Sequence, residues 1–222
     1  HKAQSGEWAR RALLIAGEDY QIRKTYFIER MNNFAKDYIP SEMLITRLYA
    51  GYNLTADNVV SEMNKGVAIV VVDAHGSSSG FDPFYIAEAE SLANGPALPL
   101  IDAFSCSVAP YTSDSEYWAL SLLKNPKGGA ISIIGSPTLL MTAAMDRKDG
   151  PHIAPYFFAS LLFGRDLPEW FRKEFPEYGS FLQGIRIRPF RQGDNYFFGA
   201  ICHGTFESLP AVNFFGDPDI SL

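Results

Sequence analysis

The chain has 222 residues, enough for one α/β domain with a sizeable core but too few for two full domains. Its formal charge is −6 and no stretch is rich in Lys and Arg, which argues against nucleic-acid binding. No run of about 18 apolar residues is present, so no segment is predicted to span a membrane. The chain starts at His1 with no signal peptide, and we expect it to be a mature or excised piece of a longer product.

The first part of the chain alternates between apolar runs and amphipathic stretches. In chain order we predict a strand at Ala12–Ala16, a helix at Ile22–Tyr38, a strand at Met43–Leu48, a helix from Thr55 to about Met63, a strand at Val67–Val72, a loop at Gly76–Pro83 and a helix at Tyr85–Ala93. Thr55 is the expected N-cap, because its hydroxyl can accept a hydrogen bond from the first turn. The run at 67–72 shows no alternation, which is typical of a parallel strand buried on both faces.

The second part continues the same alternation. We predict a strand at Leu100–Phe104, a helix at Ser113–Lys124 capped by Ser113 or Ser115, a strand at Ala130–Ile134 and helices at Pro151–Phe163 and Leu167–Phe175. The aromatic-rich segments Asn195–Thr205 and Ala211–Phe215 fit either a helix or a strand. Strands that alternate with helices indicate a parallel sheet covered on both faces, and therefore an α/β domain.

A histidine and a cysteine follow two of these buried strands. His75 comes after the strand that ends at Asp73, and Cys106 comes after the strand that ends at Phe104. Reacting groups on open α/β sheets lie just past the carboxyl ends of the strands. An imidazole beside a thiol is the usual means of generating a thiolate nucleophile at neutral pH. The two residues therefore form a candidate catalytic pair.

Acyl transfer by such a pair also needs hydrogen-bond donors for the developing oxyanion. Gly76 directly follows the histidine and allows a substrate carbonyl to approach the backbone closely. We expect the amides of Gly76 and Cys106 to supply these donors. The small serines around both residues would leave room for an extended peptide.

Structural interpretations compete with this one. A single buried cysteine is usually a small core residue, and a single histidine is usually a satisfied polar group. A disulfide between Cys106 and Cys202 would consume the proposed nucleophile. The chain has no CxxC or HxxxH spacing, so no zinc site is predicted, and no cofactor is required. Acidic loops could hold a structural Ca²⁺, although no ligand spacing points to one specifically.

Longer motifs resemble the catalytic domain of gingipain-type cysteine peptidases, which have the caspase fold. They run in the family's order through nearly the whole chain: Ala12-Leu-Leu-Ile-Ala-Gly-Glu-Asp19, Val70-Val-Val-Asp-Ala-His-Gly-Ser77, Ala93-Asn-Gly-Pro96, Leu98-Pro-Leu-Ile-Asp-Ala-Phe-Ser-Cys106, Asn125-Pro-Lys-Gly-Gly-Ala-Ile-Ser-Ile-Ile-Gly-Ser136 and Phe214-Phe-Gly-Asp-Pro-Asp-Ile-Ser-Leu222. The resemblance implies a single three-layer α/β/α caspase-like domain over residues 1–222, with about six mostly parallel strands.

The same resemblance implies roles for individual residues. His75 would be the general base and Cys106 the nucleophile. An acidic residue near the first strand can orient the histidine in this family, and of the two available carboxylates we expect Glu18 rather than Asp19 to do so. Family members often cleave after basic residues, and Asp82, Asp146 and Asp149 are the alternative acids for such a pocket; each also reads as a surface charge.

Three departures from the family pattern affect the surroundings of this pair. Ala74 and Ser105 stand before the histidine and the cysteine, where Gly and Ala are common. After Cys106 the sequence reads Ser-Val-Ala-Pro rather than a turn that contains glycine. These changes leave the pair itself intact and bear on substrate specificity.

The expected function is that of a cysteine endopeptidase that acts through an acyl-enzyme. Its partners would be a protein or peptide substrate and further domains of a secreted or cell-surface prokaryotic protein, with no nucleic acid and no membrane. The alternative is a non-catalytic caspase-fold module for binding or adhesion, which the altered loop at 107–110 favours. A flavodoxin-like ligand-binding domain fits less well, since no glycine-rich phosphate loop follows the first strand.

Overall fold

The computed structural model describes residues 6–20, 24–110, 116–139 and 213–216. The chain divides into two compact units. The first comprises residues 1–33, 41–140 and 210–216 and contains the β-sheet and most of the helices. The second comprises residues 34–40, 141–209 and 217–222, and of these only 34–40 are described, as the end of a helix and the residues after it.

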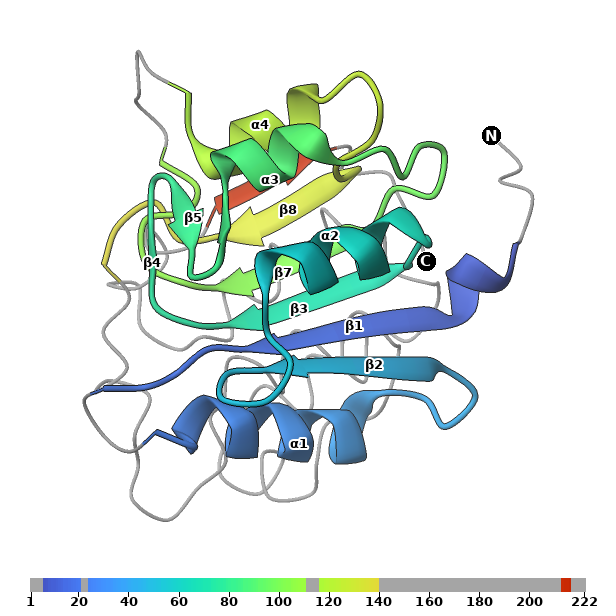
Figure 1. Ribbon diagram of the computed structural model, residues 1–222, viewed down its shortest axis with the longest axis vertical. Coiled ribbons are helices and arrows are strands. Elements are labelled where there is room, and N and C mark those ends of the chain that lie inside the picture. The colour runs from blue at the N-terminus through green and yellow to red at the C-terminus, as the bar shows by residue number, and fades with distance from the viewer. Residues whose placement is uncertain (1–5, 21–23, 111–115, 140–212, 217–222) are drawn as a thin grey trace, which may run out of the picture. The chain divides into compact units, whose positions relative to one another are not determined.

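A six-stranded sheet forms the framework of the first unit (Figure 1). In spatial order its strands are β2 (Leu44–Tyr49), β1 (Arg11–Ala16), β3 (Ile69–Asp73), β7 (Leu100–Phe104), β8 (Ser132–Gly135) and β9 (Asn213–Gly216). All neighbouring strands are parallel except β9, which runs antiparallel to β8. The arrowheads of β3, β7 and β8 therefore point to the same edge, on the left in Figure 1. The prediction of a mostly parallel α/β sheet is confirmed.

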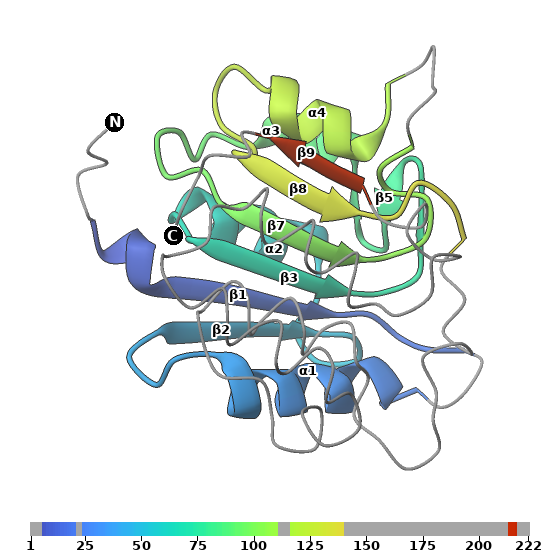
Figure 2. The same ribbon diagram turned by 180° about the vertical axis from the view of Figure 1, so that it is seen from behind.

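The helices between these strands lie on opposite faces of the sheet. They are α1 (Tyr26–Tyr38), α2 (Ala56–Asn64), α3 (Ile86–Ser91) and α4 (Trp118–Lys124), and a short 3₁₀ helix (Glu7–Arg10) precedes β1. The chain moves from β1 to β2 in one direction and from β2 to β3 in the other. Right-handed crossovers therefore place α1 and α2 on different faces. Figure 1 shows α2, α3 and α4 in front of the sheet, and Figure 2 shows them behind it.

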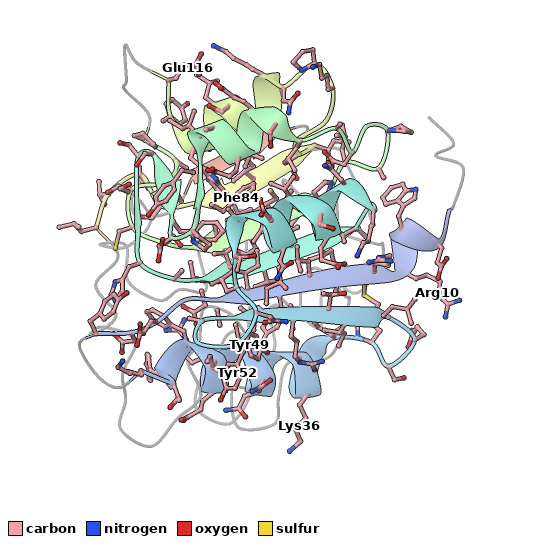
Figure 3. The ribbon with its side chains drawn as sticks, in the orientation of Figure 1. Arg10, Lys36, Tyr49, Tyr52, Phe84 and Glu116 are labelled. Carbon is pink, nitrogen blue, oxygen red and sulfur yellow. The ribbon has the colours of Figure 1, made fainter. Side chains whose placement is uncertain are left out.

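Alternation along the strands determines which side chains face these three helices. Leu13 and Ile15 of β1, Val70 and Val72 of β3, and Ile101 and Ala103 of β7 belong to one buried cluster with residues of α2, α3 and α4. Successive side chains point to opposite faces, so Asp73 and Asp102 lie on the other face. Phe84 belongs to the same buried cluster, whereas Figure 3 shows Arg10 and Glu116 extending outward at the margins of the view.

Several predicted elements are reproduced closely. The strand at 100–104 matches in full, and the strand predicted at 12–16 begins one residue earlier. The hydroxyl of Thr55 accepts a hydrogen bond from the amide of Asn58, so the predicted N-cap of α2 is confirmed. Residues 213–215 of the ambiguous segment lie in a strand, β9.

Other predictions differ from the structure. The predicted helix at 113–124 begins at Trp118 with Tyr117 as its N-cap, so neither predicted serine caps it. The predicted loop at 76–83 contains two short strands, β4 (Gly76–Ser77) and β5 (Gly80–Phe81), which form a small antiparallel sheet with β6 (Phe84–Tyr85) just after it. Pairs this short carry too little alternation to be visible as strands in the sequence. The helices predicted at 151–163 and 167–175 and the segment 195–205 lie outside the described residues.

Candidate active site

Backbone pairing brings the ends of β3 and β7 together. Asp73 and Phe104 are register partners, and the amide of Ala74 donates to the carbonyl of Phe104 at 3.3 Å. The hydroxyl of Ser105 in turn donates to the carbonyl of Ala74 at 2.9 Å. Pairing therefore continues one residue beyond the strands. His75 and Cys106 are the next residues in the segments that follow β3 and β7, at the same edge of the sheet.

The backbone of Gly76 packs directly against the segment that carries the cysteine. A Cβ atom at Gly76 would lie 2.8 Å from Cβ of Ser105, 2.9 Å from the carbonyl oxygen of Cys106 and 2.9 Å from Cγ1 of Val108. Real Cβ atoms almost never approach other atoms so closely. Only glycine therefore lets the two strand ends come this close.

The imidazole of His75 has a carboxylate beside it. Oδ1 of Asp19 lies 3.5 Å from Nε2 of His75. The Asp19 side chain is 3% exposed and Nε2 is fully buried, while the His75 side chain as a whole is 41% exposed. The ring thus has one buried nitrogen next to an acid and another part open to solvent.

Two aromatic rings flank the same imidazole. Tyr20 stacks on it with an interplanar angle of 11° and a centroid distance of 5.7 Å. Phe27, from the first turn of α1, meets it edge-on at 5.3 Å and 68°. Asp19, Tyr20 and Phe27 all belong to the connection between β1 and α1 or to the start of that helix. This part of the chain therefore surrounds the histidine on several sides.

The expectation that Glu18 orients the histidine is not met by the geometry. The carboxylate of Glu18 pairs with the Lys24 ammonium at 2.8 Å, across the same connection, and is partly exposed. The acid beside His75 is Asp19. The two neighbouring carboxylates therefore have different partners, and only that of Asp19 lies beside the imidazole.

The loop after the cysteine makes a left-handed turn without glycine. Ser107 has a φ of 55°, in the region that non-glycine residues seldom adopt. Its amide donates to the carbonyl of Thr138 at 2.8 Å, and the amide of Ala109 donates to the carbonyl of Ser136 at 3.0 Å. Cys106 itself is half-buried. The segment after β8 thus holds the cysteine loop in its bent conformation.

Two further carboxyl groups lie on the sheet face opposite the main core. Asp73 pairs with Arg30 of α1 at 3.0 Å, and both side chains are buried. Burial raises the pKa of Asp73 to about 6; the Arg30 charge opposes this shift and Asp19 adds to it. Burial together with the neighbouring Asp73 raises the pKa of Asp102 to about 8. Asp102 is therefore largely protonated at neutral pH.

The other predicted site residues are more scattered. Asp82 accepts a hydrogen bond from the hydroxyl of Tyr85 at 3.4 Å in the small sheet after His75. Asp146, Asp149 and Cys202 lie outside the described residues. No group of three or more His, Cys, Asp or Glu side chains in the described part of the chain is arranged to hold a metal ion, and the structural Ca²⁺ stays a prediction. Within the same residues, no helix is long and apolar enough to cross a membrane.

Sequence reasoning missed Tyr20 and Arg30. An exposed tyrosine in a loop and an arginine within a helix carry no sequence signal for a site, because their importance arises only from packing against residues of other strands. The one available signal for Tyr20 was its position next to Asp19, directly after a strand that ends at the reactive edge.

Three of the known structures that match this chain share its fold. The crystal structure of the Arg-specific cysteine proteinase gingipain R matches with a TM-score of 0.67 and 19% identity, over 97% of this chain and 48% of that one. The complex of the RgpB pro- and mature domains from Porphyromonas gingivalis matches with a TM-score of 0.68 and 18% identity, over 96% and 48%. A structure described only as a protease matches with a TM-score of 0.69 and 15% identity, over 97% of this chain and 48% of that one. The fold is therefore the caspase-like fold of the gingipains, and the chain spans about half the length of these structures.

The family follows from the sequence over the full length of the chain. The model of peptidase family C25 matches residues 1–222. No curated protein matches the sequence. The chain belongs to peptidase family C25.

Proposed function

We propose that this domain is a cysteine endopeptidase in which His75 and Cys106 form the catalytic dyad. The observation that carries the proposal is the contact of Gly76 with the segment from Ser105 to Val108, at the edge where β3 and β7 end. It brings the residue next to the histidine into contact with the residues on both sides of the cysteine. Membership in peptidase family C25 supports the same chemistry.

The orientation of His75 supports different roles for its two ring nitrogens. Nε2 is buried beside Asp19, so Nδ1 is the ring atom left to take the thiol proton of Cys106. Asp19 stabilises the resulting imidazolium, as a carboxylate near a cation does. The thiolate attacks the scissile carbonyl, and the C–N bond breaks as the imidazolium returns its proton to the leaving amine. Water then hydrolyses the thioester and releases the acyl product and the thiol.

The amide of Gly76 is one proposed donor to the oxyanion of that intermediate, and the pairing of β4 with β5 supports this choice. Ser77 and Gly80 flank a two-residue turn, so they form the hydrogen-bonded pair of β4 and β5. Gly76 and Phe81, the next pair, are then not hydrogen-bonded to each other, and the amide of Gly76 points away from β5. We propose this amide, together with that of Cys106, as the oxyanion donors.

The substrate is proposed to be a protein or peptide with a basic P1 residue. Support comes from gingipain R, which is described as Arg-specific, and from the formal charge of −6 of this chain. We also propose that the domain is part of a larger secreted or cell-surface protein, since it spans about half of the matched structures.

The non-catalytic alternative depended on the altered loop after Cys106. In the structure Ser107 adopts the left-handed conformation that a glycine would adopt in such a turn. The departure in sequence therefore does not imply a different loop shape, and this favours the peptidase.

Incubation with peptide substrates and thiol-directed peptidyl inhibitors tests the proposal. We expect cleavage after Arg or Lys, and an inhibitor adduct that mass spectrometry maps to Cys106. Cys106→Ala should abolish both, and His75→Ala should reduce labelling strongly while leaving the fold intact by circular dichroism. A folded chain that neither cleaves nor is labelled with any P1 residue would support the binding module instead.

A further inference from the structure

Tyr20 stands out among the exposed aromatic residues of the described chain. Its side chain is 72% exposed, yet its ring lies almost parallel to the imidazole of His75, at 11° and 5.7 Å between centroids. An exposed aromatic ring usually has little reason to keep one orientation. Here it covers a functional group, while Tyr52, which is 81% exposed, has no aromatic partner within the described residues.

We propose that Tyr20 is a positioning residue for the catalytic imidazole. This inference rests on the proposed function, because it assigns Tyr20 a role through His75. Three groups hold the imidazole: Asp19 at Nε2, Phe27 at the ring edge and Tyr20 on the ring face. Oδ1 of Asp19 lies 3.5 Å from Nε2 without a hydrogen bond between them, so this contact still permits rotation of the ring. A ring stacked on the imidazole face opposes that rotation.

The residues just before Tyr20 are anchored to the strand that carries His75. Glu18 and Lys24, on either side of Tyr20 in the sequence, form an ion pair at 2.8 Å. Gly17, just before this pair, donates its amide to the carbonyl of Asp73, and a Cβ at Gly17 would lie 2.8 Å from that of Ala74. The start of the loop is thus fixed to the strand end that carries His75.

Stacking also has an electrostatic consequence. The face of a tyrosine ring carries negative potential and attracts a cation above it. The imidazolium that forms when Cys106 loses its proton is such a cation. Tyr20 therefore favours the thiolate–imidazolium state in the same sense as Asp19 does, but from the ring face.

The test compares Tyr20→Ala and Tyr20→Phe with Tyr52→Ala as the matched control for loss of an exposed tyrosine. We expect Tyr20→Ala to lower kcat/KM about 2- to 10-fold, the range that an aromatic pair is worth, mostly through kcat. Tyr20→Phe keeps the ring and should retain activity, and Tyr52→Ala should match the parent. A loss of equal size in Tyr20→Phe, or an effect on KM alone, would overturn the positioning role.

A nuclear magnetic resonance experiment tests the role of Tyr20 separately from the proposed function. In a Cys106→Ala background with labelled histidine, the ring resonances of His75 are assigned by their loss in His75→Gln. Tyr20→Ala should shift these resonances, whereas Tyr20→Phe and Tyr52→Ala should leave them nearly unchanged. Unchanged resonances in Tyr20→Ala would show that the stack does not hold the ring, even if the peptidase is active. A parent chain that cleaves nothing would refute the proposed function, and the resonances would still decide whether Tyr20 holds the ring.

Discussion

A Cβ atom on Gly76 would lie 2.9 Å from the carbonyl oxygen of Cys106, so the absence of a side chain at one residue determines how closely the two strand ends can approach. The backbone of Cys106 cannot move easily, because its neighbours on both sides form hydrogen bonds. Ser105 donates to the carbonyl of Ala74, and Ser107 donates to the carbonyl of Thr138. A single methyl group at Gly76 must therefore displace the loop that carries the cysteine.

We accordingly expect Gly76→Ala to lower the free energy of unfolding by about 1–3 kcal/mol, the usual cost of overpacking, and to reduce activity strongly. Gly51→Ala is the control. Gly51 has a φ of 78° but no atom within 4 Å of an added Cβ, so it incurs backbone strain alone. Urea unfolding and kcat/KM check both variants, and full activity in Gly76→Ala would contradict the close contact.

Asp19 rather than Glu18 lies beside His75, so neutralising these two carboxylates should affect activity unequally. We expect Asp19→Asn to lower kcat/KM on the order of 10-fold or more, because general-base catalysis contributes about 10²–10⁴-fold and depends on orientation of the base. Glu18→Gln removes only the exposed pair with Lys24 and should cost much less. A larger loss in Glu18→Gln than in Asp19→Asn would reverse this assignment.

The left-handed conformation of Ser107 predicts how the cysteine loop tolerates substitution. A β-branched side chain is especially unfavourable at a φ of 55°, so Ser107→Val should cost about 1–2 kcal/mol of stability. Ser107→Gly removes the strain and should keep activity and stability close to those of the parent. Thermal unfolding of the two variants measures the difference, and equal stabilities would argue against a left-handed residue at this position.

The buried carboxyl of Asp102 predicts that stability falls as the pH rises. Its pKa is about 8 in the folded chain, against an ordinary value of 3.8 for an aspartate side chain. Folding therefore takes up a proton between these values, and the free energy of unfolding decreases over that window and is lowest above it. Asp73 has a pKa of about 6, so it also lowers the free energy of unfolding as the pH rises, over the lower range between its ordinary pKa and about 6.

Asp102→Asn keeps the shape of the side chain and cannot ionise. We expect it to reduce the loss of stability between pH 5 and pH 8 by on the order of 1 kcal/mol or more. Urea unfolding at the two pH values provides the measurement. A parent chain that gains stability over this interval would refute the assignment of a neutral Asp102.

Much of the framework was predictable from the sequence because its signals are local. A mostly apolar run such as 67–72 or 100–104 is typical of a buried strand, and each run is followed by its own candidate reactive residue. Parallel strands end at one edge, so His75 and Cys106 could be assigned to that edge before any contact was known.

The sequence by itself determined the parallel strands β1, β2, β3, β7 and β8 and the edge at which the histidine and the cysteine lie. Only the tertiary structure decided which side chains lie next to each other: Asp19 rather than Glu18 beside His75, Tyr20 on the face of its ring, and Arg30 beside Asp73. The physical reason is the range of the interactions. Strand formation follows from hydrophobic patterning within a few residues, whereas the direction of a side chain at a strand end depends on loop closure and on atoms from distant parts of the chain.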